Sequence, residues 1–133
     1  PGDVIEMHGQ SLWRNGVPVE TQPDPEPCQF YDIDEHQPPP GKLIPCRGVH
    51  ETLGSVRFRV AWSLPPMEND APHKFTVPAD QVFVIGDNRS NSHDSRHFGA
   101  IPISRVTAKV RRVLWSFSPS QKPRKERTLL PVH

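Results

Sequence analysis

The chain has 133 residues, of which 17 are prolines, and its 16 basic and 15 acidic side chains leave a formal net charge of +1. Proline interrupts helices and cannot donate a hydrogen bond inside a sheet, so this content argues against a helical bundle. The small net charge argues against nucleic-acid binding, and no apolar run approaches the roughly 20 residues of a membrane-spanning helix. We therefore expect one small, soluble, β-rich domain.

The N-terminal residues predict a β-meander. Asp3–Met7 alternates apolar and polar side chains, and Ser11–Arg14 follows after a turn. The pair Asn15-Gly16 is typical of a two-residue hairpin turn, because both central residues of that turn need positive φ angles. Val17–Val19 then returns as the third strand of the meander.

Residues 21–45 predict a long surface excursion rather than regular structure. Prolines, including the run Pro38–Pro40, hold this stretch extended, and the acidic residues between them keep it in water. Phe30, Tyr31 and Ile33 allow one short strand within the excursion.

The metal-ligating side chains do not predict a metal site. Cys46 and His50 have a ligand-like spacing, and His93 and His97 are four residues apart. A histidine pair at that spacing needs a helix, however, and the loop around it is rich in Asn, Ser and Gly. Without a Cys-x-x-Cys pair, we expect Cys28 and Cys46 to form one disulfide or to remain two thiols, with a zinc site as the weaker alternative.

Three apolar segments predict the strands in the middle of the chain. Ser55–Trp62 alternates strictly between apolar and polar side chains, which is typical of a half-buried strand. Leu64–Pro72 is expected to be a turn-rich connection. His73–Val77 is then expected to form a short strand, and Gln81–Ile85 a strand that is buried on both faces.

The C-terminal residues predict one more strand and a tail. A short 3₁₀ turn near Ile103–Arg105 is compatible with the sequence. Val106–Phe117 alternates until its phase changes at Arg111-Arg112, which indicates a bulge. Residues 119–133 are basic and lack periodicity, so we expect a disordered tail.

A dense polar loop, Gly86–Arg96, directly follows the apolar run. A simple turn needs two to four polar residues, whereas this loop reads Gly-Asp-Asn-Arg-Ser-Asn-Ser-His-Asp-Ser-Arg. A polar loop at the end of a rigid apolar strand is typical of a site where chemistry is positioned. The alternative is a loop that is held only by its own Asx and Ser hydrogen bonds.

The order of residues in this loop resembles the last signature box of type I signal peptidases, the membrane-anchored serine proteases that remove signal peptides. The match runs from Phe83 to Pro102, and Pro1-Gly2-Asp3 is similar to the end of an earlier box, Gly-x-Pro-Gly-Asp. The resemblance implies an all-β fold of antiparallel sheets coiled on each other, with a long Pro-rich loop insertion. We expect the domain to span residues 1–118, with residues 21–75 as the variable inserted region.

In that family the catalytic groups are a serine and a lysine, and the lysine acts as a base only if burial lowers its pKa from about 10.4 towards neutral. The resemblance implies that the Ser92 hydroxyl hydrogen-bonds this lysine and that Asp94 and Arg96 form an ion pair behind the site. Gly86 lies where the backbone passes close to the lysine. The residues that would brace the loop are Asp87, Asn88, Arg89 and Asn91.

Two departures from the family pattern matter. Ser90 stands where the family usually has aspartate, which weakens one bracing contact. The family's nucleophilic serine and its lysine both precede Pro1, and none of Lys42, Lys74 and Lys109 has a suitable local setting. We therefore expect the chain, which opens without methionine, to be the C-terminal portion of a longer protein and to be inactive alone.

The resemblance also implies a cellular setting. The parent protein would remove signal peptides from secreted preproteins after small residues, without a cofactor. It would be anchored in the membrane upstream, with this domain on the extracytoplasmic (periplasmic) side, where oxidising conditions permit a Cys28–Cys46 bridge. The basic side chains and tryptophans could touch the lipid surface, although a solvated sheet face and a packed core explain them more simply.

Two alternatives remain at this point. The first is a non-catalytic β-domain that binds peptides by adding a strand at an open sheet edge. The second is a related maturation peptidase of a conjugation or pilus system.

Overall fold

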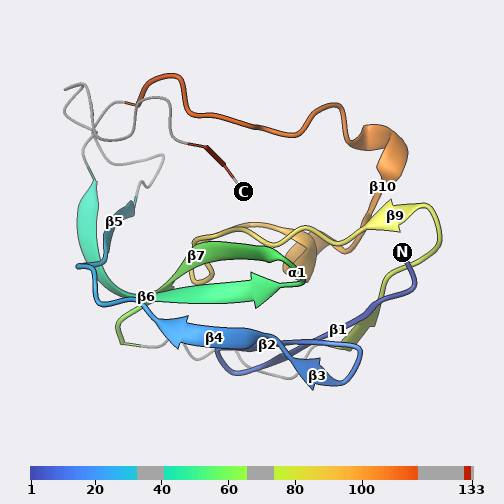
Figure 1. Cartoon of the computed structure of the whole chain (residues 1–133), viewed down its shortest axis with the longest axis horizontal. Helices are drawn as coiled ribbons and strands as arrows, with labels where there is room; N and C mark the ends of the chain where they lie inside the picture. Colours follow the sequence, from blue (N-terminus) through green and yellow to red (C-terminus); the bar gives the residue numbers. More distant parts are fainter. Residues whose placement is uncertain (33–40, 66–73, 117–130, 133) are drawn as a thin grey trace.

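The computed structural model describes residues 1–32, 41–65, 74–116 and 131–132, and these residues form mostly β-strands (Figure 1). The helical elements of the described residues are a one-turn helix, α1 (Ser95–Phe98), and a 3₁₀ turn at Ile103–Arg105, where the sequence was compatible with one. All pairs between the named strands are antiparallel, so the expected all-β fold of antiparallel sheets is confirmed. The strands are β1 (Val4–His8), β2 (Ser11–Arg14), β3 (Val17–Pro18), β4 (Glu20–Pro23), β5 (Gln29–Asp32), β6 (Lys42–Leu53), β7 (Val56–Ser63), β8 (Lys74–Thr76), β9 (Gln81–Val82) and β10 (Ile101–Pro102).

The first sheet has the strand order β3-β2-β1-β8. Asn15 and Gly16 connect β2 to β3 with φ angles of 54° and 76°, the region that asparagine and glycine tolerate best. The side chain of Asn15 accepts a hydrogen bond from the backbone N–H of Val4 at 2.7 Å, which ties the turn to β1. The predicted meander and the predicted short strand at β8 are therefore confirmed.

β6 is the longest strand and lies at the centre of the second group of strands. It pairs with β4, β5 and β7, and its C-terminal part from Cys46 to Leu53 forms a hairpin with β7. The sequence analysis expected residues 21–45 to form a surface excursion, because prolines and acidic residues are frequent there, and it made no prediction for residues 46–53. That expectation is wrong for β4 and for the first residues of β6. Pro45 joins the strand through its carbonyl group, which accepts a hydrogen bond from the N–H of Leu64 at 3.0 Å.

A disulfide joins Cys28 to Cys46, whose Cα atoms are 4.9 Å apart. The N–H of Cys46 also donates a hydrogen bond to the carbonyl of Cys28 at 3.0 Å. The bridge fastens the residue before β5 to the middle of β6. Neither the two-thiol nor the zinc alternative applies to these cysteines.

The hydrophobic core lies between the two groups of strands. Met7 and Leu12 come from the first sheet, and Val49, Val60 and Trp62 come from β6 and β7. Figure 1 shows β1, β2 and β4 running along one side of the β6–β7 hairpin. From Phe58 to Trp62 the less exposed side chains alternate with more exposed ones, as the sequence predicted, whereas Val56 at the start of β7 is 38% exposed rather than buried.

Two predicted strands differ from the structure. Gln81–Ile85 forms only the two-residue strand β9, and Val84 beyond it is 39% exposed, because the chain leaves the sheet and begins the polar loop early. The strand predicted at Val106–Phe117 is absent over residues 106–116, which run along the edge of the molecule (Figure 1). Among the described residues, this segment pairs only through the bridge between Arg112 and Pro131, so it lacks the neighbour that a strand requires.

Some expectations lie outside the described residues. They concern Ile33, Pro38–Pro40, most of the connection at Leu64–Pro72, and the tail at 119–133 apart from residues 131–132.

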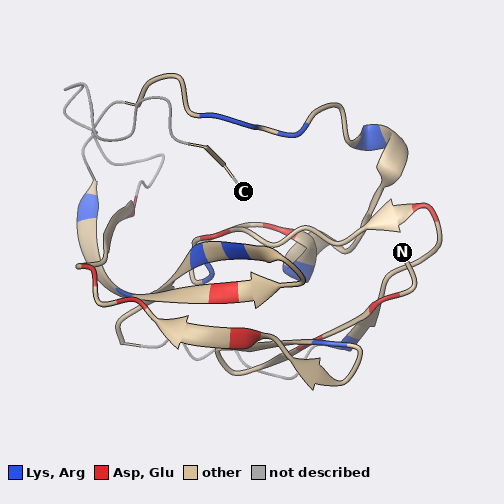
Figure 2. Ribbon diagram, in the orientation of Figure 1, with Lys and Arg blue, Asp and Glu red and all other residues tan. Residues whose placement is uncertain are grey.

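Acidic and basic side chains are interspersed through the middle of the molecule rather than sorted onto separate faces. Figure 2 shows acidic residues on β6 beside basic residues on β7, with both kinds in the loop that follows β9. This distribution favours local ion pairs over a continuous basic surface.

The buried end of β7 offers a test of the core. Val60 is 1% exposed, and we expect Val60→Ala to lower the free energy of unfolding by about 2 kcal/mol, because it removes buried methyl groups and leaves a cavity. Val17 on β3 is 64% exposed, so Val17→Ala is the matched control and should change stability little. Urea unfolding measures both. Equal effects of the two substitutions would contradict this description of the core.

Candidate functional site

The polar loop after β9 is bound to the edge of β7. The N–H of Ala61 donates to the carbonyl of Asp87, and the N–H of Arg89 donates to the carbonyl of Ala61, both at 2.8 Å. These bonds form a parallel bridge between Ala61 and Asn88. Asp87 and Arg89, on either side of Asn88, thus attach the loop through their backbone, whereas the Asn88 carbonyl accepts from the N–H of Asn91 at 3.1 Å within the loop. The Asp87 side chain is exposed. The position of the loop along β7 is fixed by the sheet itself.

Asp94 is the centre of the hydrogen bonding within the loop. Its Oδ1 accepts from the Nε of Arg96 at 2.8 Å and from the backbone N–H of Arg96 at 3.1 Å. Its Oδ2 accepts from the Nη2 of Arg96 and from the N–H of Gly86, both at 2.7 Å. Asp94 also caps α1, the one-turn helix that carries Arg96. The structure therefore brings Asp94, Arg96 and Gly86 into one cluster.

Ser92 packs directly against the backbone of Gly86. A Cβ atom placed at Gly86 would lie 2.1 Å from the Ser92 Oγ and 2.4 Å from its Cβ. No side chain fits in that space, so only glycine lets Ser92 take this half-buried position. The two residues form a close pair in front of the Asp94–Arg96 ion pair.

Ser95 bonds back to Val84, before the loop, and so joins the two ends of the loop a second time. The sequence analysis missed this role. Its Oγ accepts a hydrogen bond from the N–H of Val84 at 3.0 Å, and its N–H donates to the carbonyl of Val84 at 3.1 Å. The position of Ser95 between Asp94 and Arg96, at the start of a helical turn, was the signal that could have identified it.

Ser90 and Asn91 join the loop to neighbouring strands. The Ser90 Oγ accepts a hydrogen bond from the N–H of Ser63 at 2.8 Å, so serine in place of the family's aspartate still makes a contact. The Asn91 Nδ2 donates to the Oδ1 of Asp32, at the end of β5, at 3.1 Å. The disulfide in turn fastens the start of β5 to β6. Ser90 and Asn91 thus attach the loop to β7 and β5, two strands that are distant from it in sequence.

Arg89 is buried and pairs with Glu51 of β6. The two side chains are about 2% and 1% exposed, and both nitrogens at the tip of Arg89 donate to the two carboxylate oxygens, one bond at 2.7 Å. The Arg89 guanidinium also lies 5.9 Å from the ring centroid of Trp62. The sequence analysis did not identify Glu51, because nothing local distinguishes it from a solvated acidic residue on a strand.

The pKa of Asp94 is shifted by opposing effects. Burial raises it, but the hydrogen bonds from the Arg96 side chain and from the backbone N–H groups of Gly86 and Arg96 outweigh burial. The net result is a pKa below the ordinary value of 3.8, so the carboxylate is ionised at neutral pH.

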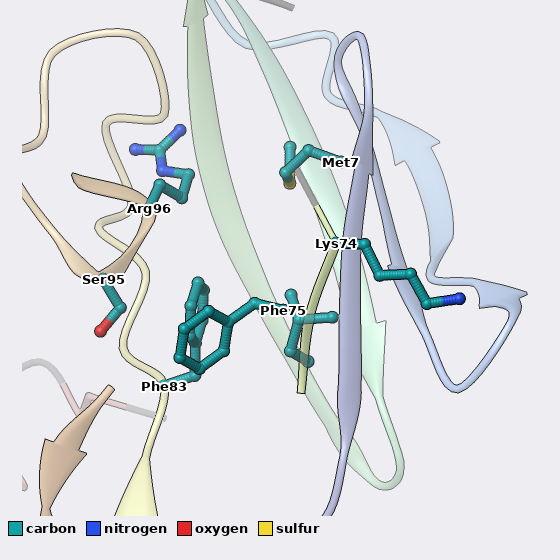
Figure 3. Close-up of a pocket in the computed structure, with 7 residues that line it drawn as sticks. Met7, Lys74, Phe75, Phe83, Ser95 and Arg96 are labelled. Carbon is teal, nitrogen blue, oxygen red and sulfur yellow. The ribbon is translucent and has the colours of Figure 1, made fainter. Parts of the chain in front are cut away.

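A pocket of about 110 Å³ lies behind the loop, between β1, β8 and α1 (Figure 3). The rings of Phe75 and Phe83 lie side by side in it, with centroids 5.1 Å apart, and Ser95 and Arg96 form its other wall. In Figure 3 the amine of Lys74 points away from these rings. That amine is exposed and lies 3.6 Å from the carboxylate of Glu6, so Lys74 does not supply a buried base to this pocket.

His93 and His97 lie together on the outside of the loop. Their rings are stacked with centroids 5.1 Å apart. His97 lies in α1, whereas His93 precedes the N-cap residue Asp94, so the two histidines do not share a helix. Within the described residues, no three His, Cys, Asp or Glu side chains group closely enough to hold a metal ion.

Comparison with known proteins gives one consistent family. The model of the family described as signal peptidase, peptidase S26 matches residues 1–115. The chain is similar to signal peptidase I of Bacillus caldolyticus (48% identical over 117 residues, 88% of this chain and 50% of that protein) and to signal peptidase IB of Staphylococcus aureus (29% over 118 residues, 89% and 50%). It is also similar to mitochondrial ATP-independent inner membrane protease subunit 1a of Arabidopsis thaliana (38% over 63 residues, 47% and 38%). The chain thus spans half of the length of the two signal peptidases.

Acid should loosen the loop through Asp94. Because the pKa of Asp94 is lower in the folded protein than in the unfolded chain, its contribution to stability is present above the unfolded value and is lost as the pH falls through the folded value. We expect Asp94→Asn to destabilise the protein at pH 7 and to reduce the loss of stability between pH 7 and pH 3, as measured by urea unfolding.

Asp3 provides the control, because hydrogen bonds from Asn15 and Arg14 lower its pKa at a distance from the loop. Asp3→Asn should change the same pH dependence without altering hydrogen exchange at the Gly86 amide. Asp94→Asn should accelerate that exchange. An unchanged Gly86 amide in Asp94→Asn would refute the role of Asp94 in the loop.

Proposed function

Because the chain belongs to the peptidase S26 family of signal peptidases, we propose that it forms the supporting half of the catalytic domain of a serine endopeptidase that removes signal peptides. In this proposal the substrates are the signal peptides of secreted preproteins, cleaved after small residues. The observation that carries the proposal is the packing of Ser92 on Gly86, with both residues backed by the Asp94–Arg96 ion pair. No cofactor is required.

Ser92 orients a lysine base in the proposed mechanism. A lysine can take a proton from a serine nucleophile only when its amine is uncharged, although its ordinary pKa is about 10.4. A hydroxyl group can accept a hydrogen bond from an uncharged amine and fix its direction without stabilising the ammonium form as a carboxylate would. The position of Ser92 against Gly86 supports this role, since the glycine backbone leaves room for the Ser92 hydroxyl to lie beside the loop backbone.

Asp94 and Arg96 support this role through their charges. A carboxylate close to a lysine favours the ammonium form, which would be inactive as a base. Both oxygens of Asp94 are engaged by the Arg96 guanidinium, and the positive charge of Arg96 offsets that of the carboxylate. The pair thereby shapes the loop while adding little net negative charge beside the proposed lysine site.

The nucleophile and the base are assigned to the part of such peptidases that this chain does not span. Among the candidate lysines of the chain, Lys42 is exposed at the start of β6, Lys74 is exposed beside Glu6, and Lys109 is exposed on the segment after the 3₁₀ turn. None has the buried setting that a neutral lysine needs. We propose that the chain alone is inactive.

The proposed location is the extracytoplasmic side of a membrane, with the anchor outside this chain. Over the ranges that the structure describes, none of the helices has the length and apolar character needed to cross a membrane. The Cys28–Cys46 disulfide supports an oxidising compartment such as the periplasm or the cell exterior.

The first test is Ser92→Ala in the full-length protein. If Ser92 orients the base, kcat for cleavage of a preprotein should fall by about 100-fold or more, with KM little changed, because proton transfer is affected and substrate binding is not. Ser55 lies exposed in the turn between β6 and β7, so Ser55→Ala is the matched control and should keep full activity. Cleavage is followed by the shift from precursor to mature protein on a gel. Parental activity in Ser92→Ala would remove Ser92 from the mechanism.

The second test uses the 133-residue chain by itself. We expect it to leave a preprotein uncleaved under conditions in which the full-length protein cleaves it. Cleavage by the chain alone would contradict the assignment of the nucleophile and base to the other part of the protein. Absence of cleavage by the full-length protein, together with binding of the signal peptide to the chain, would favour the alternative of a peptide-binding domain.

A further inference from the structure

Glu51 occupies one of the least exposed positions in the described structure. It lies within β6, opposite Thr21 of β4 on one side and Phe58 of β7 on the other, and it is 1% exposed. A carboxylate taken out of water at such a position is costly unless a cation with good geometry compensates for it. For the stability of the strand alone, an apolar side chain at this position would be at least as favourable as a buried ion pair.

The compensating cation comes from the polar loop. Arg89 is separated from Glu51 by 38 residues and grips its carboxylate with both terminal nitrogens. The third nitrogen of Arg89, Nε, is buried and finds no hydrogen-bond partner in the described part of the chain. The side chain of Arg89 is therefore held mainly by Glu51, with the Trp62 ring beside it.

Arg89 transmits this attachment to the Asp94–Arg96 pair. The carbonyl oxygen of Arg89 accepts a hydrogen bond from the Nη1 of Arg96 at 2.6 Å, while the other two nitrogens of Arg96 hold Asp94. Asp94 in turn holds the N–H of Gly86, on which Ser92 packs. A continuous series of contacts thus runs from the C-terminal part of β6 to Ser92.

We propose that Glu51 is a positioning residue for the reaction: through Arg89 it sets the place of Arg96 and Asp94, and hence the direction of the Ser92 hydroxyl. The proposal rests on the proposed function and adds to it a residue outside the signature loop. The bridge at Ala61 fixes the loop along β7, and Glu51 fixes how deeply the loop sits against the sheet. Loss of Glu51 leaves Arg89 as a buried charge without its counterion, so Arg89 and the loop shift towards water.

The test compares two variants of the full-length protein, Glu51→Gln and Glu20→Gln. We expect Glu51→Gln to lower kcat by about 10- to 100-fold with KM little changed, because a small misplacement of a positioning group has effects of this size. Glu20 lies exposed on β4 and is the matched control, with parental kinetics expected. Parental kcat in a folded Glu51→Gln variant would overturn the proposal.

A double substitution separates positioning from stability. Glu51→Leu combined with Arg89→Met replaces the buried ion pair by apolar side chains of similar size, which often restores stability. We expect the urea midpoint to recover in the double variant while kcat stays low, because the loop has lost its attachment. Recovery of kcat together with the urea midpoint would reduce Glu51 to a structural residue. If Glu51→Gln does not fold, Glu51→Asp takes its place in the kinetic comparison.

Hydrogen exchange at the Gly86 amide provides a readout that does not depend on catalysis. Exchange should be about tenfold faster or more in Glu51→Gln, whereas the amide of Val19, bonded to the Leu12 carbonyl, should be unchanged. Unchanged exchange at Gly86 would overturn the proposal even in an active enzyme. If Glu51→Gln speeds exchange at Gly86 but the unsubstituted full-length protein cleaves no preprotein, the proposed function is refuted and the attachment of the loop through Glu51 is retained.

Discussion

The candidate site depends on the hydrogen bonds that the carboxylate of Asp94 accepts. It accepts two hydrogen bonds from the guanidinium of Arg96, one from the backbone N–H of Arg96 and one from the N–H of Gly86. The loop is mainly polar, so it gains little from hydrophobic burial, and charge-assisted hydrogen bonds must hold its shape. Because Gly86 and Arg96 lie at the two ends of the loop, one side chain closes it.

The rest of the fold supplies the support behind that carboxylate. The apolar core between the two groups of strands holds β6 and β7 in place. β7 offers its edge to the backbone of the loop, and β6 offers Glu51 to Arg89. Apolar burial thus stabilises the sheets without specifying direction, whereas the directional bonds to the loop decide where its side chains point.

The sequence predicted those features that depend on residues close together in the chain. The Asn15-Gly16 turn, the alternation along β7 and the polar loop after β9 each depend on neighbouring residues, and each is present. The ion pair between Glu51 and Arg89 was not predictable, because 38 residues separate its partners and neither is unusual in its own segment. β6 was not predicted either, because it begins in a proline-rich stretch and the strands that pair with it, β4, β5 and β7, come from other parts of the sequence. Alternation alone was also insufficient at residues 106–116, since a strand needs a neighbour.

The ion pairs that hold the loop form among the described residues, so the proposed site can be ordered before the lysine base is present. Asp94 pairs with Arg96, Glu51 pairs with Arg89, and the Arg89 carbonyl joins the two pairs, so this arrangement forms without a lysine. A site that is formed before the base arrives can orient the amine without paying the ordering entropy at that moment. In the proposed mechanism the Ser92 hydroxyl directs the amine, while the remaining side chains keep that hydroxyl in place.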